Sequence, residues 1–249
     1  DVGRRHVLEQ VGRDDRVGGL VGPRITASNL VRAALAEPQP RGVDGSESPR
    51  RTIEHIAEDC ITAMREKQAR GSFFIAGYSS GGIVAFEIAR QLANAGEDIG
   101  LLALLDSMGP HARLRHSPWR ERVGRILVPQ LRMIQERVYY LVLHRVGLQH
   151  RRRLAKVGEA QRWAHWAYRP GAYEGSALII AADASSQKIG DPALGWGKLI
   201  NGGVRVRVLE AAPGSLMQEP AVAVVAAMLQ RELDAAATGS RPRLESPPA

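Results

Sequence analysis

The stretch that most constrains the fold of this 249-residue chain is a glycine-flanked serine between two apolar segments. Residues 73–76, Phe-Phe-Ile-Ala, form a compact apolar run, and a helical apolar stripe begins at Ile83. Between them lies a Gly-x-Ser-x-Gly pattern made by Gly77, Ser79 and Gly81. This order predicts a buried strand, a sharp turn and a helix, with the serine at the tip of the turn.

The chemistry of a nucleophilic serine explains this spacing. A serine at such a tip has a strained backbone, and the residues two before and two after it crowd each other. Gly77 and Gly81 suit these two positions because neither carries a Cβ atom. Ser79 is therefore the candidate nucleophile of a nucleophile elbow, and the backbone N–H of Ser80 is the candidate donor to an oxyanion. The alternative is a tight packing turn without chemistry.

The composition is that of one globular domain. Hydrophobic residues make up 44% and charged residues 24% of the chain. Cys60 is the only cysteine, which excludes an internal disulfide and predicts a packed thiol. No apolar run approaches the roughly 20 residues of a membrane span, and no hydrophobic signal segment is found near Asp1. We expect a cytoplasmic protein without membrane contact, and the histidines show no metal-ligand spacing.

The net charge of +8 is concentrated in one segment. Between His111 and Lys156 there are 12 Lys and Arg residues against 2 acidic residues, which gives +10 and leaves −2 for the rest of the chain. A diffuse basic surface would suit nucleic acid, so this localised charge argues against a nucleic-acid partner. It predicts either a surface for an acidic partner, including Arg151, Arg152 and Arg153, or a solvated face.

The segments around the serine turn predict a parallel sheet. From Thr52 onward, apolar residues follow the spacing of one helical face: Ile53, Ile56, Ala57, Cys60, Ile61 and Met64. After the helix that follows the turn, Ile99 to Leu105 form a continuous apolar run that ends at Asp106. Continuous hydrophobicity is typical of a strand covered on both faces, so the unit is a right-handed βαβ. Asp106 then lies at the carboxyl end of its strand, where ligand-binding loops gather.

The second half of the chain predicts a helical lid and a return to the sheet. No strand pattern interrupts residues 107–170, which carry mixed helical stretches such as Val123 to Leu148. The sheet resumes at Ser176 to Ala182 and at Val204 to Leu209, and a final helix begins near Pro220.

We expect three regions along the chain. Residues 1–41 are a degenerate or poorly ordered N-terminal segment, although Ser28 to Glu37 predicts a short helix. Residues 42–235 form the α/β domain with its lid over about 107–170, and residues 236–249 are a disordered tail rich in Pro, Ser and Arg.

Several motifs resemble the type I thioesterase domains of nonribosomal peptide and polyketide synthases. They are Gly-Val-Asp-Gly-Ser-Glu-Ser-Pro at 42–49, the turn and helix from Ile75 to Leu92, and Leu-Leu-Ala-Leu-Leu-Asp-Ser at 101–107. Tyr-Arg-Pro-Gly-Ala-Tyr-Glu-Gly at 168–175 and Asp-Pro-Ala-Leu-Gly-Trp at 191–196 resemble the family's return from its lid to the sheet. The likeness covers about Gly42 to Leu233.

The resemblance implies an α/β-hydrolase-like, mainly parallel sheet flanked by helices, with an all-helical lid. It implies that Ser79 takes an acyl or peptidyl chain from the phosphopantetheine arm of a carrier protein, with no cofactor bound by the domain itself. The resulting ester would pass to water or to a nucleophile on the chain itself, which would close a ring. Asp106 would hold the tautomer of a histidine, and that histidine would activate Ser79.

The histidine of this triad has no match. The family carries it in the loop after the last strand, which here runs from Leu209 to Pro220, so its position falls near Pro213 to Ser215. All seven histidines precede that loop: His6, His55, His111, His116, His144, His150 and His165. His165, between Trp163 and Trp166, is the one substitute that we consider, because a base must reach the serine by a hydrogen bond.

The N-terminal segment also departs from the family. Its first strand ends in a His-Pro-x-Gly-Gly-like loop that supplies one oxyanion donor, and no stretch before Gly42 matches this loop. Loss of a triad member costs on the order of 10⁴ to 10⁶ in turnover, so the sequence predicts little catalysis. Three functions stay open: a thioesterase-like domain, a catalytically silent module that binds a carrier protein or acyl chain, and a general serine esterase.

Overall fold

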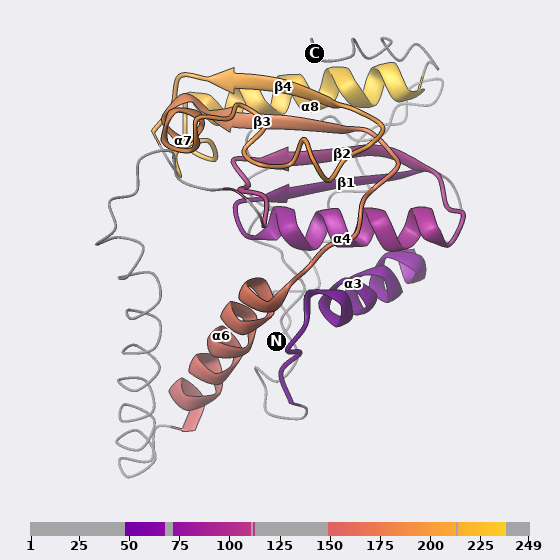
Figure 1. The fold of residues 1–249 in the computed structure, drawn as a ribbon, viewed down its shortest axis with the longest axis vertical. Coiled ribbons are helices and arrows are strands. Elements are labelled where there is room, and N and C mark those ends of the chain that lie inside the picture. Colours follow the sequence, from indigo (N-terminus) through magenta and orange to yellow (C-terminus); the bar gives the residue numbers. More distant parts are fainter. Residues whose placement is uncertain (1–47, 68–71, 111, 113–148, 213, 238–249) are drawn as a thin grey trace, which may run out of the picture.

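A computed structural model describes residues 48–67, 72–110, 112, 149–212 and 214–237, with the backbone alone for 149–155. Within these residues a four-stranded parallel sheet has helices on both of its faces (Figure 1). This arrangement confirms the predicted α/β class with a mainly parallel sheet.

The sheet contains β1 (Phe73–Tyr78), β2 (Ile99–Leu105), β3 (Ala177–Ala182) and β4 (Val204–Leu209), in that spatial order. All three neighbouring pairs are parallel. The central strand β3 is buried along its whole length, which explains its uninterrupted apolar sequence. The bounds of β2 and β4 are those predicted, whereas β1 extends two residues further and β3 begins one residue later.

Helices α3 (Ile53–Lys67) and α4 (Gly81–Asn94) cover one face of the sheet, and α8 (Ala221–Ala237) covers the other (Figure 1). The first face packs Phe73 and Ile75 against Phe86 and Leu92 of α4, which are almost fully buried. Cys60 of α3 packs at the margin of this cluster, as predicted. Because all four strands are parallel, their carboxyl ends lie along one edge of the sheet, where the loops that follow them can converge.

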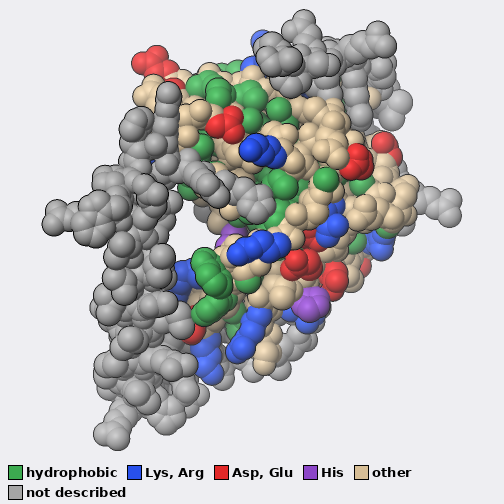
Figure 2. Space-filling model, in the orientation of Figure 1, with side chains coloured by type: hydrophobic (Ala, Val, Ile, Leu, Met, Phe, Trp, Pro, Cys, Tyr) green, Lys and Arg blue, Asp and Glu red, His purple; other side chains and the backbone are tan. Residues whose placement is uncertain are grey.

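Helix α6 (Gln149–Ala167) falls within the expected lid, about residues 107–170, and is helical as predicted, whereas residues 107–110 and 112 of that range are not helical. It extends away from the sheet beside α3, and both hydrophobic and basic side chains lie over it (Figures 1 and 2). A short helix that the sequence did not predict, α7 (Asp183–Ile189), follows β3. Its seven residues are too few and too polar to show a helical apolar stripe, and Gly190 ends it with a left-handed backbone, φ 74°.

Some predicted features lie outside the described residues. These are the whole N-terminal segment 1–41 with its helix over Ser28 to Glu37, the lid helix over Val123 to Leu148, and the histidines at 6, 111, 116 and 144. Helix α8 continues to Ala237, so residues 236 and 237 of the expected tail are helical, and residues 238–249 lie outside the described residues.

Two kinds of feature are absent from the described residues. None of the helices there combines the length and the apolar character needed to cross a membrane. In the same part of the chain, no group of three or more His, Cys, Asp or Glu side chains is placed to hold a metal ion.

Candidate active site around Ser79

Ser79 lies at the tip of the turn between β1 and α4. Its φ of 51° is in the left-handed region, which a residue with a side chain adopts only at an energetic cost. The Ser79 N–H donates a hydrogen bond to the Leu105 carbonyl oxygen at 2.9 Å, which ties the turn to the end of β2. The local geometry is that of a nucleophile elbow.

The glycines around the turn are required by close packing. A Cβ atom on Gly77 would lie 2.5 Å from the Gly81 carbonyl oxygen and 2.6 Å from the Cα of Gly82. Gly77 and Gly81 therefore crowd each other in the expected way. The structure adds Gly82, because a Cβ atom there would overlap the side chain of Ser107. The sequence analysis missed this contact, since Ser107 comes from the loop after the next strand.

Ser80 is the residue that precedes α4, and its backbone is already helical, with φ −63° and ψ −29°. The N–H groups of Gly82 and Ile83 donate to the carbonyl oxygens of Ser79 and Ser80, both at 3.2 Å. No described residue accepts a hydrogen bond from the Ser80 N–H. This N–H stands at the positive end of the helix and is available to a developing negative charge.

Asp106 directly follows β2, one residue beyond the carbonyl that binds the Ser79 N–H. It also has a left-handed backbone, with φ 43°. Its N–H donates to the Ile180 carbonyl oxygen at 2.7 Å, and its Oδ1 accepts the Ala182 N–H at 3.2 Å. The two candidate residues therefore sit on neighbouring strand ends, and Asp106 is fixed to the end of β3.

The block Asp191 to Trp196 supports the loop that follows Asp106. The Asp191 carboxylate accepts the N–H groups of Ala193 and Gly195, both at 2.8 Å. The indole N–H of the buried Trp196 donates to the Ser107 carbonyl oxygen at 2.7 Å. These contacts give the Asp-Pro-Ala-Leu-Gly-Trp motif a structural role beside the candidate carboxylate.

Tyr78 is a neighbour of this site that the sequence analysis did not single out. Burial raises the pKa of its phenol, and the negative charge of Asp106 raises that pKa further. Tyr78 is thus a protonated hydroxyl group near Asp106. A Cβ atom on Gly214 would lie 3.9 Å from the Tyr78 hydroxyl oxygen.

The loop after β4 therefore returns to the candidate site. The Ala211 N–H donates to Asp183 Oδ1 at 3.1 Å, and the Ser215 N–H and hydroxyl both donate to the Ala212 carbonyl oxygen. Gly214 has a left-handed backbone with φ 82°. Pro213 lies outside the described residues. The loop holds no histidine, so it brings no imidazole to Asp106 or Ser79.

His165, the substitute named from the sequence, does lie beside the elbow. Its Nε2 is 3.1 Å from the Ser80 carbonyl oxygen, and its Nδ1 is 2.8 Å from the Gln161 carbonyl oxygen. Both ring nitrogens are thus directed at backbone carbonyl oxygens of α6 and the elbow. Among the described contacts, neither nitrogen is paired with the Ser79 hydroxyl. His55 lies elsewhere, on α3, 2.9 Å from the Thr52 hydroxyl oxygen.

A buried carboxylate joins the elbow helix to α6. Glu87 of α4 is 0% exposed, and its two oxygens accept hydrogen bonds from Arg90, Gln91 and the Tyr168 hydroxyl. Burial alone would raise the Glu87 pKa, but the bonds from Arg90, Tyr168 and Gln91 outweigh it and lower that pKa. Burial and the bond to Glu87 raise the Tyr168 pKa well above its ordinary value. The sequence gives one sign of this network, because Glu87 is a charged residue within the apolar stripe of α4.

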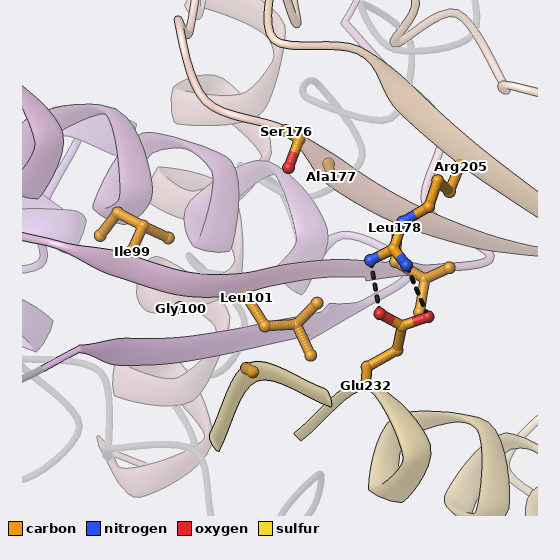
Figure 3. A pocket seen from close by; sticks show the side chains of 9 residues that line it. Ile99, Gly100, Leu101, Ser176, Ala177, Leu178, Arg205 and Glu232 are labelled. Atoms are coloured by element: carbon orange, nitrogen blue, oxygen red, sulfur yellow. Dashed lines mark hydrogen bonds and ion pairs between the residues drawn. The ribbon is translucent and has the colours of Figure 1, made fainter. Parts of the chain in front are cut away.

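The hollow between β2, β3 and α8 is not part of this site. Its volume is about 20 Å³, which is room for one water molecule. It is lined by the first residues of the strands and by Glu232, whose carboxylate pairs with both terminal nitrogens of Arg205 (Figure 3). It therefore lies at the amino ends of the strands, opposite Ser79 and Asp106.

Comparison with known proteins places the chain in a family. Residues 26–231 match the family described as "Thioesterase domain". Nonribosomal peptide synthetase pngA of Aspergillus terreus is 35% identical over 100 residues, which cover 37% of this chain and 10% of that protein. Non-reducing polyketide synthase CTB1 of Cercospora beticola is 35% identical over 77 residues, which cover 29% of this chain and 4% of that protein. The chain thus spans a small part of these relatives.

Solved structures agree in fold. The NocB thioesterase domain from the nocardicin cluster has a TM-score of 0.54 at 22% identity, covering 78% of this chain and 79% of that one. The RedJ thioesterase from the prodiginine pathway of Streptomyces coelicolor has a TM-score of 0.54 at 19% identity, covering 84% and 82%. With its α/β-hydrolase-like sheet and the match over residues 26–231, the chain belongs to the thioesterase domain family.

Proposed function

We propose that this chain acts in natural-product biosynthesis as a thioesterase-like domain that accepts an acyl or peptidyl chain from a carrier protein. The observation that carries the proposal is the left-handed Ser79 at the amino end of α4, with Asp106 on the adjacent strand end. Similarity to a nonribosomal peptide synthetase and a polyketide synthase supports the substrate class that we propose, a thioester on the phosphopantetheine arm of a carrier protein. We assign this function to residues 42–235, with the lid over about 107–170.

The proposed transfer exchanges a thioester for an oxygen ester. The Ser79 Oγ forms a bond to the thioester carbonyl carbon, and the carbon–sulfur bond breaks. The serine proton ends on the departing thiol, so the products are acyl-Ser79 and the free thiol of the pantetheine arm. The Ser80 N–H stabilises the negative oxygen that forms in between. Water, or a nucleophile on the acyl chain, then releases the product.

The site supports slow turnover rather than fast turnover. Among the described side chains no imidazole nitrogen contacts the Ser79 hydroxyl, and both nitrogens of His165 are directed at carbonyl oxygens. Removing a triad member leaves roughly 10³ to 10⁴-fold catalysis over water, which comes from the oxyanion site and binding. The same observation favours a second candidate, a silent module that binds the carrier protein or its acyl chain without turning it over.

Mass spectrometry of the intact protein distinguishes these two functions. We expect incubation with an octanoyl thioester of N-acetylcysteamine to produce a slowly growing octanoyl adduct on Ser79. The adduct should be absent from Ser79→Ala and retained in the matched control Ser80→Ala, which keeps the backbone N–H. No adduct on Ser79 would favour the silent module, and an equal adduct in Ser79→Ala would contradict the assignment of the nucleophile.

A further inference from the structure

The outer face of α6 carries two exposed tryptophans. The side chains of Trp163 and Trp166 are 41% and 69% exposed. Their ring centroids are 5.3 Å apart and the rings meet edge to face at 89°. Residues three apart lie on the same side of a helix, so the two rings form one aromatic patch. We call these two residues the tryptophan pair.

The opposite side of α6 is the one that packs on the protein. Val157, Ala160, Ala164 and Tyr168 recur at helical spacing and are between 1% and 8% exposed. Ala164 and Tyr168 form a small cluster with the buried Ile53 of α3. The tryptophan pair is thus not part of the packing that holds α6 in place. Exposed aromatic surface of this kind is typical of a site for another molecule.

Basic side chains precede and follow the tryptophan pair along the chain. Lys156, Arg162 and Arg169 are exposed, and Glu159, the one acidic residue of α6, is half-buried one turn before Trp163 on the same side of the helix. The Arg169 guanidinium donates to the Trp166 carbonyl oxygen at 2.9 Å, which holds its charge beside that tryptophan. Hydrophobic and basic side chains appear together over α6 in Figure 2. Tryptophan and arginine dominate the binding energy of protein interfaces, and this charge suits an acidic partner.

The outer face of α6 lies close enough to Ser79 for a protein bound there to deliver a substrate to the serine. His165 contacts the Ser80 carbonyl oxygen at 3.1 Å, so α6 is the described helix that touches the elbow from outside the sheet. A protein docked on the outer face of α6 would be separated from Ser79 by about the width of one helix, roughly 10 Å. A flexible pantetheine arm attached to such a protein could pass the helix and reach the serine.

We propose that the tryptophan pair, with Lys156, Arg162 and Arg169, docks an acidic helical surface of the carrier protein. This inference rests on the proposed function and adds the place and chemistry of the partner contact. The tryptophans supply the apolar contact, and the three cations supply attraction and orientation. Because the cations are exposed, binding should weaken as salt concentration rises.

The test uses the full chain and a fluorescently labelled holo peptidyl carrier protein in an anisotropy titration. We expect Trp163→Ala with Trp166→Ala to weaken binding at least about ten-fold, as interface hot spots do. Arg162→Glu should weaken binding and reduce its salt dependence. The matched controls are Val224→Ala and Arg231→Glu on α8, where Val224 is 44% exposed and Arg231 is also exposed. They should change the dissociation constant by less than about two-fold.

Other outcomes would overturn the inference. Equal losses in the α8 controls, or full binding by the double tryptophan variant, would show that the carrier protein docks elsewhere. A carrier protein whose acidic helix residues are changed to Asn and Gln should bind weakly, and unchanged affinity would exclude charge recognition. Concentration-dependent dimers that Trp166→Ala abolishes, seen by sedimentation without carrier protein, would assign the pair to a second copy of this chain.

The octanoyl-N-acetylcysteamine reaction separates this inference from the proposed function. This small thioester has no protein surface to dock, so the tryptophan variants should acylate Ser79 at the rate of the unmodified protein. If they lose that reaction as well, the pair contacts the acyl chain and the docking inference fails. If the unmodified protein is acylated but binds no carrier protein, the inference fails while the proposed chemistry stands.

Discussion

The Nε2 atom of His165 lies 3.1 Å from the carbonyl oxygen of Ser80, the residue next to the candidate nucleophile. This contact brings a histidine to the elbow, while its Nδ1 faces the Gln161 carbonyl oxygen. Because both ring nitrogens are directed at carbonyl oxygens and not at the Ser79 hydroxyl, we expect His165 to hold α6 against the elbow and not to act as a base.

We expect His165→Ala to leave the reaction of Ser79 with a fluorophosphonate within about three-fold of the unmodified rate, since loss of a working base costs far more. Labelling measured by intact mass over time gives both rates. His55→Ala, on α3 and away from the elbow, is the matched control. A large loss confined to His165→Ala would identify His165 as the base.

The Glu87–Tyr168 hydrogen bond should contribute to stability. The Tyr168 hydroxyl donates to the buried Glu87 carboxylate at 2.6 Å, and bonds to charged groups contribute roughly 1.5 to 3 kcal/mol. Tyr168→Phe should lower the free energy of unfolding by about that amount, as measured in urea. A change below about 0.5 kcal/mol would show that Arg90 and Gln91 alone satisfy the carboxylate.

The same pair predicts how stability depends on pH. The Glu87 pKa is lowered from its ordinary value of 4.5, so its contribution is present above that pH and is lost as pH falls toward the folded value. The Tyr168 pKa is raised from 10.0, so its contribution is present below pH 10 and is lost as pH rises further. The free energy of unfolding, measured in urea at a series of pH values, should decline below about pH 4.5 and above about pH 10. Tyr168→Phe should reduce the alkaline decline, and an unchanged decline would contradict its assignment to Tyr168.

The packing of Gly82 against Ser107 should make the elbow intolerant of a methyl group. Gly82→Ala forces its Cβ atom onto the Ser107 side chain, and such overpacking costs about 1 to 3 kcal/mol. Gly158→Ala in α6 is the matched control, because the nearest atom to its Cβ, Arg162 Nη1, would be 3.6 Å away. That control should stabilise the helix by about 0.5 to 1 kcal/mol. Urea midpoints that fall equally for both variants would show that Ser107 moves aside.

The sequence could predict the elements whose apolar pattern is local. The run Ile99–Leu105 is β2 to the residue, because a buried parallel strand needs continuous hydrophobicity. The segment Val204–Leu209 is β4 to the residue, and its alternation of Val with Arg suits a strand at the edge of the described sheet that is not fully buried. Helix α7 was missed because its support is tertiary: Asp183, its first residue, accepts the Ala211 N–H from the loop after β4.

In the candidate site, too, some residues could be placed from local sequence, and others depend on tertiary packing. Ser79 and Asp106 could be placed because strand ends of a parallel sheet share one edge. The partners of Glu87 could not, since Tyr168 comes 81 residues later and meets it only when α6 packs on α4. The approach of Gly214 to Tyr78 likewise depends on the path of the loop after β4, which no local pattern encodes.

A histidine introduced at Gly214 should supply the missing base. A side chain there starts 3.9 Å from the hydroxyl oxygen of Tyr78, whose pKa is raised by the charge of Asp106. We expect Gly214→His to raise octanoyl-thioester hydrolysis by at least about ten-fold, which is less than the roughly 10² to 10⁴ that a well-positioned base contributes. Gly214→Asn controls for the left-handed backbone, φ 82°, which asparagine tolerates. Ser215→His tests the neighbouring position, and no gain in either histidine variant would mean that the oxyanion site is also incomplete.

The central claim is that Ser79 lies in a nucleophile elbow but lacks a general base. The rate at which Ser79 reacts with a fluorophosphonate tests this claim most directly, because that rate depends both on the geometry of the elbow and on activation of the serine by a base. We expect slow labelling of the unmodified protein, confined to Ser79 and absent from Ser79→Ala. Labelling as fast as in a hydrolase with a complete triad, and abolished by Ser79→Ala, would contradict the claim that no histidine base activates Ser79 in this protein.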